Sequence, residues 1–160
     1  MLLVDELANR DLVVVTGKGG TGKTAIAAAL GLACRERGRR VLVLEADPRE
    51  SLPQMLGADP SAGGVVSAGE RMAFQNVSPR RVVDEIVRER LRFGPLIVRT
   101  LKSPIYEQFV DGAPGLKELA LLAHAQRVVA KGGVDLVILD APASGHGRAL
   151  LEAPRLVGEA

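Results

Sequence analysis

The feature that most constrains the fold is a glycine-rich octapeptide near the start of the chain, Gly17-Lys18-Gly19-Gly20-Thr21-Gly22-Lys23-Thr24. It matches the pattern G-x-x-x-x-G-K-S/T, which binds phosphate when it connects a strand to a helix. Residues 12–16 before it form a β-branched run, which predicts a strand buried on both faces of a parallel sheet. Residues 25–37 after it are apolar on nearly every side, which predicts an interior helix ending at Gly38. The octapeptide is therefore placed as a phosphate-binding loop would be.

The residue types of this loop suit the phosphates of a nucleotide. Glycines let several backbone N–H groups point at an anion beside a helix N-terminus, where the helix dipole also favours negative charge. We expect the Lys23 ammonium to contact the β- and γ-phosphates and the Thr24 hydroxyl to be a ligand of Mg²⁺. The predicted nucleotide-binding residues of the loop are Gly17, Gly19, Gly20, Thr21, Gly22, Lys23 and Thr24. The alternative is a glycine turn that only joins a strand to a helix.

Lys18 adds a second positive charge directly after the first glycine. Two roles are open to it. Its side chain either points into solvent, as most surface lysines do, or reaches across a dimer interface to the nucleotide of a partner subunit, as an arginine finger does.

Apolar segments alternate along the rest of the chain in the α/β manner. Strands are predicted at 41–44, 72–77 and 136–139, the last ending at Asp140. Helices are predicted from Ser78-Pro79 to about residue 93, in short pieces between 95 and 114 broken at Pro104 and Gly112, over 116–131, and from Leu150 onward. We therefore predict an α/β fold with a doubly wound, mainly parallel sheet of the P-loop NTPase type, in one domain over residues 1–160.

Composition excludes several other classes of protein. One cysteine in 160 residues rules out a disulfide framework and a cysteine-cluster metal site within this stretch. Aromatic residues make up 2% of the chain, which leaves few side chains on which the bases of a single strand could stack. The net charge of +2 neither demands nor excludes nucleic acid, and we expect no nucleic-acid partner. No run approaches the roughly 18 apolar residues of a membrane span, and the first residues do not resemble a secretory signal. We expect a cytoplasmic protein.

The octapeptide is similar to the phosphate loop of the dimeric P-loop ATPases that include MinD, ParA, the nitrogenase iron protein and ArsA. Residues 45–52, Glu-Ala-Asp-Pro-Arg-Glu-Ser-Leu, resemble the switch I motif T-D-P-A-x-S-L of the arsenite-pump and tail-anchored-protein-targeting ATPases. Residues 140–147, followed by Leu150-Leu151 and Pro154, resemble the switch II motif of that family, and residues 113–118 resemble its P-G-x-x-E helix start. The resemblance extends from about residue 11 to about residue 154 in matching order.

The resemblance implies roles that the residues alone leave open. Asp140 would hold Mg²⁺ directly or through water, although an aspartate after a strand is also a common cap. Asp47 would orient or deprotonate the attacking water, although Asp-Pro is also an ordinary start of a turn. Gly145 would donate a backbone N–H to the γ-phosphate, and its alternative is a simple turn glycine. The implied catalytic residues are Lys18, Lys23 and Asp47.

The function implied is Mg²⁺-dependent ATP hydrolysis by a nucleotide-gated homodimer or pseudo-dimer. Switch movement would drive anion transport or membrane-protein targeting, with a membrane-protein partner or hydrophobic cargo and attachment at the periphery of the membrane. The alternatives are a partition or positioning ATPase like ParA or MinD, and a truncated chain without turnover. The segment Asp140-Ala141-Pro142-Ala143 departs from the family's D-T-A-P. Family chains are also longer, so we expect a fragment without the adenine-reading part, incomplete at the C-terminus.

Overall fold

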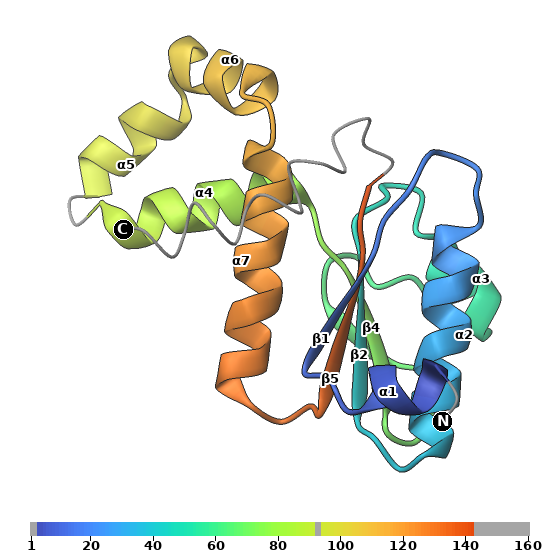
Figure 1. The fold of residues 1–160 in the computed structure, drawn as a ribbon. Coiled ribbons are helices and arrows are strands. Elements are labelled where there is room, and N and C mark those ends of the chain that lie inside the picture. Colours follow the sequence, from blue (N-terminus) through green and yellow to red (C-terminus); the bar gives the residue numbers. More distant parts are fainter. Residues whose placement is uncertain (1–2, 92–93, 143–160) are drawn as a thin grey trace.

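A five-stranded sheet forms the centre of the computed structural model, which describes residues 3–91 and 94–142 (Figure 1). The strand order is β1-β5-β2-β4-β3, and only the pairing of β3 with β4 is antiparallel. The strands are β1 (Leu12–Val15), β2 (Val41–Glu45), β3 (Val65–Ser67), β4 (Met72–Asn76) and β5 (Leu136–Asp140). The predicted mainly parallel α/β fold is confirmed.

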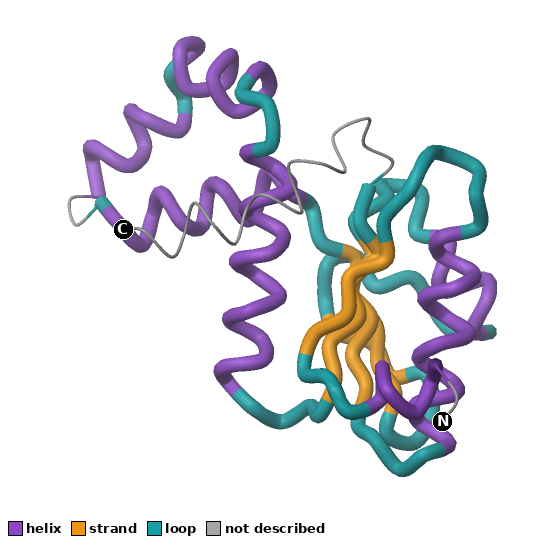
Figure 2. Tube along the Cα trace, viewed as in Figure 1, coloured by secondary structure: helices purple, strands orange, loops and turns teal. Residues whose placement is uncertain are grey.

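Helices cover both faces of this sheet. One face carries α1, α2 and α3, and the other carries α7 and the first turns of α4. The rest of α4, with α5 and α6, projects away from the sheet beside α7 (Figures 1 and 2). The helices are α1 (Leu3–Ala8), α2 (Lys23–Glu36), α3 (Ser51–Leu56), α4 (Pro79–Arg90), α5 (Gly94–Leu101), α6 (Pro104–Gly112) and α7 (Leu116–Lys131). None of the helices in the described ranges is both long and apolar enough to cross a bilayer.

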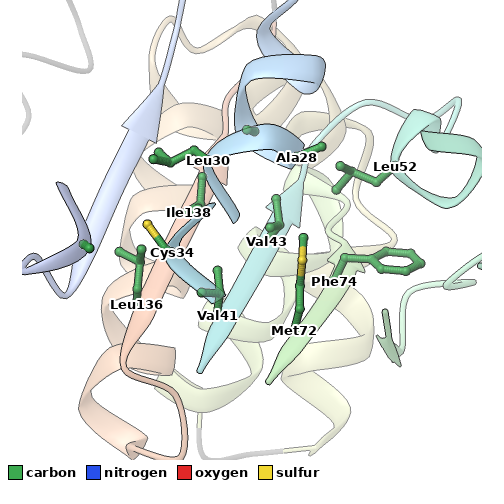
Figure 3. Close-up of a cluster of buried hydrophobic side chains, with 12 residues drawn as sticks. Ala28, Leu30, Cys34, Val41, Val43, Leu52, Met72, Phe74, Leu136 and Ile138 are labelled. Carbon is green, nitrogen blue, oxygen red and sulfur yellow. The ribbon is translucent and has the colours of Figure 1, made fainter. Parts of the chain in front are cut away.

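The core has two halves because successive side chains of a strand point to opposite faces. Val41 and Val43 of β2 face α2 and pack with Phe74 and Ile138 of the neighbouring strands (Figure 3). Leu42 and Leu44 face the other way and pack against side chains of α4 and α7. A sheet that is apolar on both faces in this way requires a helix layer on each side, as a doubly wound fold provides.

Several predicted boundaries agree with the structure. The N-cap of α4 is Ser78, whose hydroxyl oxygen accepts a hydrogen bond from the Arg81 N–H at 3.4 Å, and Pro79 takes the first helical position. The helix before Gly132 and the break at Pro104 also lie where predicted. The last helix predicted, from Leu150, falls outside the described residues.

Two expectations about burial were wrong. The predicted interior helix, α2, lies on the outside of the sheet, and its Ile26 side chain is 58% exposed. The predicted fully buried first strand, β1, is only partly buried, because it is the outermost strand of the described sheet. Neither apolar segment therefore reaches the burial of the central strands β2 and β5.

Candidate phosphate-binding site

The carboxyl ends of four parallel strands meet in one row, and this row is the foundation of the site. The register pairs Val15 of β1 with Asp140 of β5, Asp140 with Glu45 of β2, and Glu45 with Asn76 of β4. Backbone hydrogen bonds continue just past the row, from Ala141 N–H to the Val15 carbonyl and from Val77 N–H to the Glu45 carbonyl. The loops that follow β1, β2 and β5 therefore begin side by side at the edge where ligands of open α/β sheets bind.

The glycine-rich loop connects β1 to the N-terminus of α2, as predicted. Gly20 and Gly22 have positive φ angles of 76° and 80°, a conformation in which side chains are strained. Gly22 is the N-cap of α2 and supplies no side-chain cap. The Lys18 carbonyl oxygen ties the loop together by accepting hydrogen bonds from the Thr21 hydroxyl at 2.8 Å and the Lys23 ammonium at 3.2 Å. The start of α2 is thus a positive helix end suited to an anion.

Thr24 and Asp140 join the loop to the strand end that faces it. The Thr24 hydroxyl donates a hydrogen bond of 2.6 Å to Oδ2 of Asp140, across 116 residues of sequence. Asp140 is 3% exposed, and its Oδ1 is buried with no hydrogen-bond partner among the described residues. Burial raises the pKa of the Asp140 carboxyl, while the Thr24 hydrogen bond and the Lys23 charge act in the opposite direction. A buried carboxylate oxygen without a partner is a free ligand position.

A hollow of about 310 Å³ lies between the loop and these strand ends. It brings together Lys23, Thr24, Asp47 and Asp140, the four predicted side chains with chemical roles other than Lys18. Gly19, Gly20 and Gly22 also line it, whereas Gly17, Lys18 and Thr21 lie in the same loop outside its lining. Gly145 falls outside the described residues. Most of the predicted site residues in the described ranges therefore meet around one concave space.

Asp47 differs from Asp140 in its surroundings. It follows β2, is about one-third exposed, and has Arg49 as the partner of its carboxylate. The Arg49 backbone N–H donates to Oδ1 at 2.9 Å, and the guanidinium lies 3.3 Å from Oδ1 through Nε. These hydrogen bonds hold the pKa of the Asp47 carboxyl below its usual range. Asp47 is therefore the more readily ionised of the two aspartates.

Three residues near the hollow were not predicted from the sequence. Besides Arg49, Asn76 donates its side-chain amide to the Asp47 carbonyl oxygen at 2.6 Å. Glu45 is fully buried and accepts hydrogen bonds from the N–H groups of Ser51, at 2.7 Å, and Leu52 at the start of α3. Burial raises the pKa of the Glu45 carboxyl. Glu45 and Asn76 share one signal, a polar residue at the end of a strand of a parallel sheet, whereas Arg49 lies in the turn that follows β2.

Comparison of the sequence with known proteins shows which family this chain resembles. The chain is 26% identical to ATPase ASNA1 homolog 1 of Paramecium tetraurelia over 97% of its own length and 47% of the relative's. It is 26% identical to a candidate arsenical pump-driving ATPase of Aquifex aeolicus, over 91% of this chain and 38% of that one. It is 23% identical to ATPase get3 of Schizosaccharomyces japonicus, over 92% of this chain and 45% of the relative. The chain thus spans less than half the length of each of these relatives.

A sequence model of the family described as anion-transporting ATPase matches residues 10–160. Because that match takes in nearly the whole chain, including the loop, the strand-end aspartate and the segment around Asp47, the protein belongs to the anion-transporting ATPase family.

Proposed function

We propose that this domain binds Mg²⁺ and ATP in the hollow and hydrolyses the γ-phosphate bond, working as a nucleotide-gated dimer whose switch movement is passed to a partner or cargo. The observation that carries the proposal is the 2.6 Å contact between the Thr24 hydroxyl and the Asp140 carboxylate. It supports a magnesium site because a hydroxyl at the start of the helix and a carboxylate at a strand end are the protein ligands that P-loop enzymes use.

The residues present suit a magnesium ion. Magnesium usually keeps several waters and is held by one or two carboxylates together with substrate phosphates. No group of three or more His, Cys, Asp or Glu that would make a larger ligand set occurs in residues 3–91 and 94–142. Thr24 and the unpartnered Oδ1 of Asp140 would hold the ion. When bound, it would neutralise charge on the phosphates.

The remaining roles follow from position. Lys23 and the N–H groups at the start of α2 bind the phosphates, and Asp47, at the rim of the hollow, accepts a hydrogen bond from the attacking water and orients it. Gly145, which lies outside the described residues, is proposed to sense the γ-phosphate through its backbone N–H.

Lys18 supports the dimeric part of the proposal. The residue is exposed, and within the described part of the chain its ammonium group has no ion-pair partner. A free lysine beside the phosphate loop is available to the nucleotide of a second subunit, where its charge would stabilise the transition state.

The proposed cargo is an apolar segment of a partner protein. Helices α5 and α6 carry a hollow of about 440 Å³ lined mainly by Leu96, Ile105, Tyr106 and Phe109 and rimmed by Arg99. Ile105 is 79% exposed and Phe109 is 60% exposed. Apolar side chains gathered at this exposure in one place are typical of a binding surface.

The test is ATP turnover by this chain in the presence of Mg²⁺. We expect Lys23→Ala to abolish turnover and Lys18→Ala to reduce it about 100-fold or more, because each removes a charge from the reacting phosphates. Lys102→Ala is the matched control, since Lys102 is an exposed lysine in the turn after α5, and it should leave turnover unchanged.

The outcomes separate the parts of the proposal. Normal turnover by Lys23→Ala would contradict the whole site. Normal turnover by Lys18→Ala would contradict only the charge supplied by the second subunit. Binding of Mg·ATP without turnover, measured by titration calorimetry, would support the alternative of a chain that binds but does not hydrolyse.

A further inference from the structure

Arg49 is the one arginine among the described residues that line the phosphate hollow. It stands in the segment Asp47-Pro48-Arg49, at the position where the switch I motif quoted above has alanine. Its side chain is 87% exposed, so packing does not fix it in place. Its orientation therefore depends on the salt bridge to Asp47.

The guanidinium of Arg49 binds the carboxylate of Asp47, which the proposed reaction needs for orienting the attacking water. Nε lies 3.3 Å from Oδ1 of Asp47 and Nη2 lies 3.4 Å from Oδ2, so both oxygens are engaged. These distances exceed the roughly 2.7–2.9 Å of a strong charge-assisted hydrogen bond. An exposed pair of this length contributes little to stability. The Arg49 guanidinium can therefore exchange Asp47 for another anion at a small cost in free energy.

The backbone on either side of Arg49 is fixed. The Asp47 carbonyl oxygen accepts hydrogen bonds from the Asn76 side-chain amide at 2.6 Å and from the Glu50 backbone N–H at 3.2 Å. The Arg49 N–H itself donates to Asp47 at 2.9 Å. The guanidinium can therefore leave Asp47 by rotation of its own side chain, without movement of the loop.

We propose that Arg49 senses the terminal phosphate: without nucleotide its guanidinium holds Asp47, and with a triphosphate in the hollow it moves to the phosphate oxygens and leaves the Asp47 carboxylate open to the attacking water. This inference rests on the proposed function. Its chemical reason is that a planar guanidinium binds phosphate through two parallel hydrogen bonds and that a phosphate carries more negative charge than one carboxylate. The same residue thus couples binding of the terminal phosphate to release of Asp47.

The first test compares two nucleotides by titration calorimetry. Wild type, Arg49→Ala and Arg49→Lys are titrated with Mg·ATPγS and with Mg·ADP. We expect Arg49→Ala to weaken ATPγS binding about tenfold or more, as loss of a hydrogen bond to a charged group predicts, and to change ADP binding less than about twofold. Arg49→Lys should recover part of the loss, because lysine supplies charge without the bidentate geometry.

Arg10→Ala is the matched control. Arg10 makes an exposed ion pair of 3.4 Å with Glu6 on α1, close in length to that of Arg49 with Asp47. Its removal should change neither affinity. Equal weakening of ATPγS and ADP by Arg49→Ala, or no weakening of either, would overturn the sensor while leaving the proposed function intact. Failure of the wild type to bind either nucleotide would overturn both.

A double-mutant cycle tests the exchange itself. Asp47→Asn removes a negative charge near the phosphates, so it should tighten ATPγS binding in any background. If Arg49 leaves Asp47 for the phosphate, Asp47→Asn should tighten ATPγS binding more when Arg49 is present than in the Arg49→Ala background. The reason is that the variant has no Arg49–Asp47 ion pair to break on binding. If Arg49 stays on Asp47, the gain is smaller when Arg49 is present, because the carboxylate is already neutralised. A smaller gain overturns the exchange.

Discussion

The carboxyl groups around the hollow differ in how each is surrounded. Asp140 and Glu45 are buried, and burial raises the pKa of both. Asp47 lies near the surface beside Arg49, which lowers its pKa. Three carboxyl groups at one sheet edge therefore take different parts: Asp140 faces the loop through Thr24, Glu45 holds the start of α3, and Asp47 faces the hollow.

The role of Glu45 leads to a prediction about stability and pH. Because its folded-state pKa is raised, the stability that this group contributes is present below its unfolded pKa and is lost as pH rises through the folded pKa. Glu45→Gln keeps an acceptor for Ser51 but does not ionise. We expect the melting temperature of Glu45→Gln to rise relative to that of wild type as pH increases from 4 to 7, as measured by thermal unfolding.

Two further variants complete this measurement. Glu45→Ala leaves the Ser51 and Leu52 N–H groups without this acceptor and should lower the free energy of unfolding by about 1–3 kcal/mol at pH 4. That difference should become smaller as pH rises, because wild type loses stability when Glu45 ionises and alanine does not titrate. Glu36→Gln changes an exposed glutamate of α2 and should show no such dependence. A pH-independent difference between Glu45→Gln and wild type would contradict the assignment.

Much of the site could be predicted from residue identity, but its partners could not. Lys23, Thr24 and Asp140 belong to local patterns whose spacing reflects their chemistry, and the hollow brings them together. Asn76 and Arg49 act on Asp47 through contacts that depend on strand register and on one turn. Neither register nor the direction of a turn's side chain is encoded in a short motif.

At the scale of elements, a charged clasp fixes the starts of two central strands. Arg40, just before β2, donates through Nη2 to Oδ1 of Asp135, just before β5, at 2.6 Å. Its backbone N–H donates to the same carboxylate at 2.8 Å, and the Asp135 N–H donates to the Arg40 carbonyl. The pairing of β2 with β5, which places Glu45 beside Asp140, is thus held at its opposite end.

This clasp predicts a loss of stability that depends on pH. The hydrogen bonds from Arg40 lower the pKa of Asp135 to about 2. The stability it contributes is therefore present above the unfolded pKa and is lost as pH falls through the folded value. We expect Asp135→Asn to lower the melting temperature by about 2 °C at pH 7, since the pair is partly exposed.

The same experiment at acid pH gives the diagnostic result. The difference between Asp135→Asn and wild type should shrink as pH falls from about 5 toward 2. Glu6→Gln is the control, because the ion pair of Glu6 with Arg10 is exposed and lies within one helix. A difference that stayed constant over this range would show that the clasp acts through shape alone.

Element prediction succeeded where a segment has its own pattern. The strands β2 and β5 each begin with four apolar residues, β4 begins with three, and α4 and α7 have clear starts or ends. By contrast, β3 has three residues and exists through its antiparallel pairing with β4. Likewise, α3 contains Pro53, and its first N–H groups are held by Glu45 from another element. Such segments depend on tertiary contacts that the local sequence does not contain.

At the scale of the whole molecule, the two hollows lie in different regions of the fold. The hollow beside the phosphate loop lies at the edge of the sheet, next to the start of α2. The apolar hollow lies on α5 and α6, two of the helices that project from the sheet in Figure 1. The Tyr106 hydroxyl fastens α6 to α4 by donating to Asp84 at 2.7 Å, and Arg80 lies over the Tyr106 ring. Burial and the bond to Asp84 raise the pKa of Tyr106 to about 12. The projecting region thus has its own internal support.

This division predicts that cargo binding and nucleotide chemistry can be separated. The double variant Ile105→Ser, Phe109→Ser should weaken binding of a dye-labelled peptide of about 18 apolar residues at least tenfold, because it removes two large apolar side chains. ATP turnover without peptide should not change. Val65→Ser is the control, since Val65 is 61% exposed on β3, away from α5 and α6. Fluorescence anisotropy measures the peptide, and unchanged binding by the double variant would contradict the proposed cargo surface.

The anchoring of the Asp47 loop on β4 has a mechanical consequence. Asn76, the last residue of β4, holds the Asp47 carbonyl, and its backbone N–H donates to the Ser61 hydroxyl oxygen. Only Val77 and Ser78 separate this anchor from the first turn of α4. A shift of the Asp47 loop would either break the hydrogen bond from Asn76 or displace the start of α4. The far end of this twelve-residue helix lies near α5 (Figure 1). Because α4 extends away from the sheet, a small displacement of its first turn would become a larger displacement of its far end.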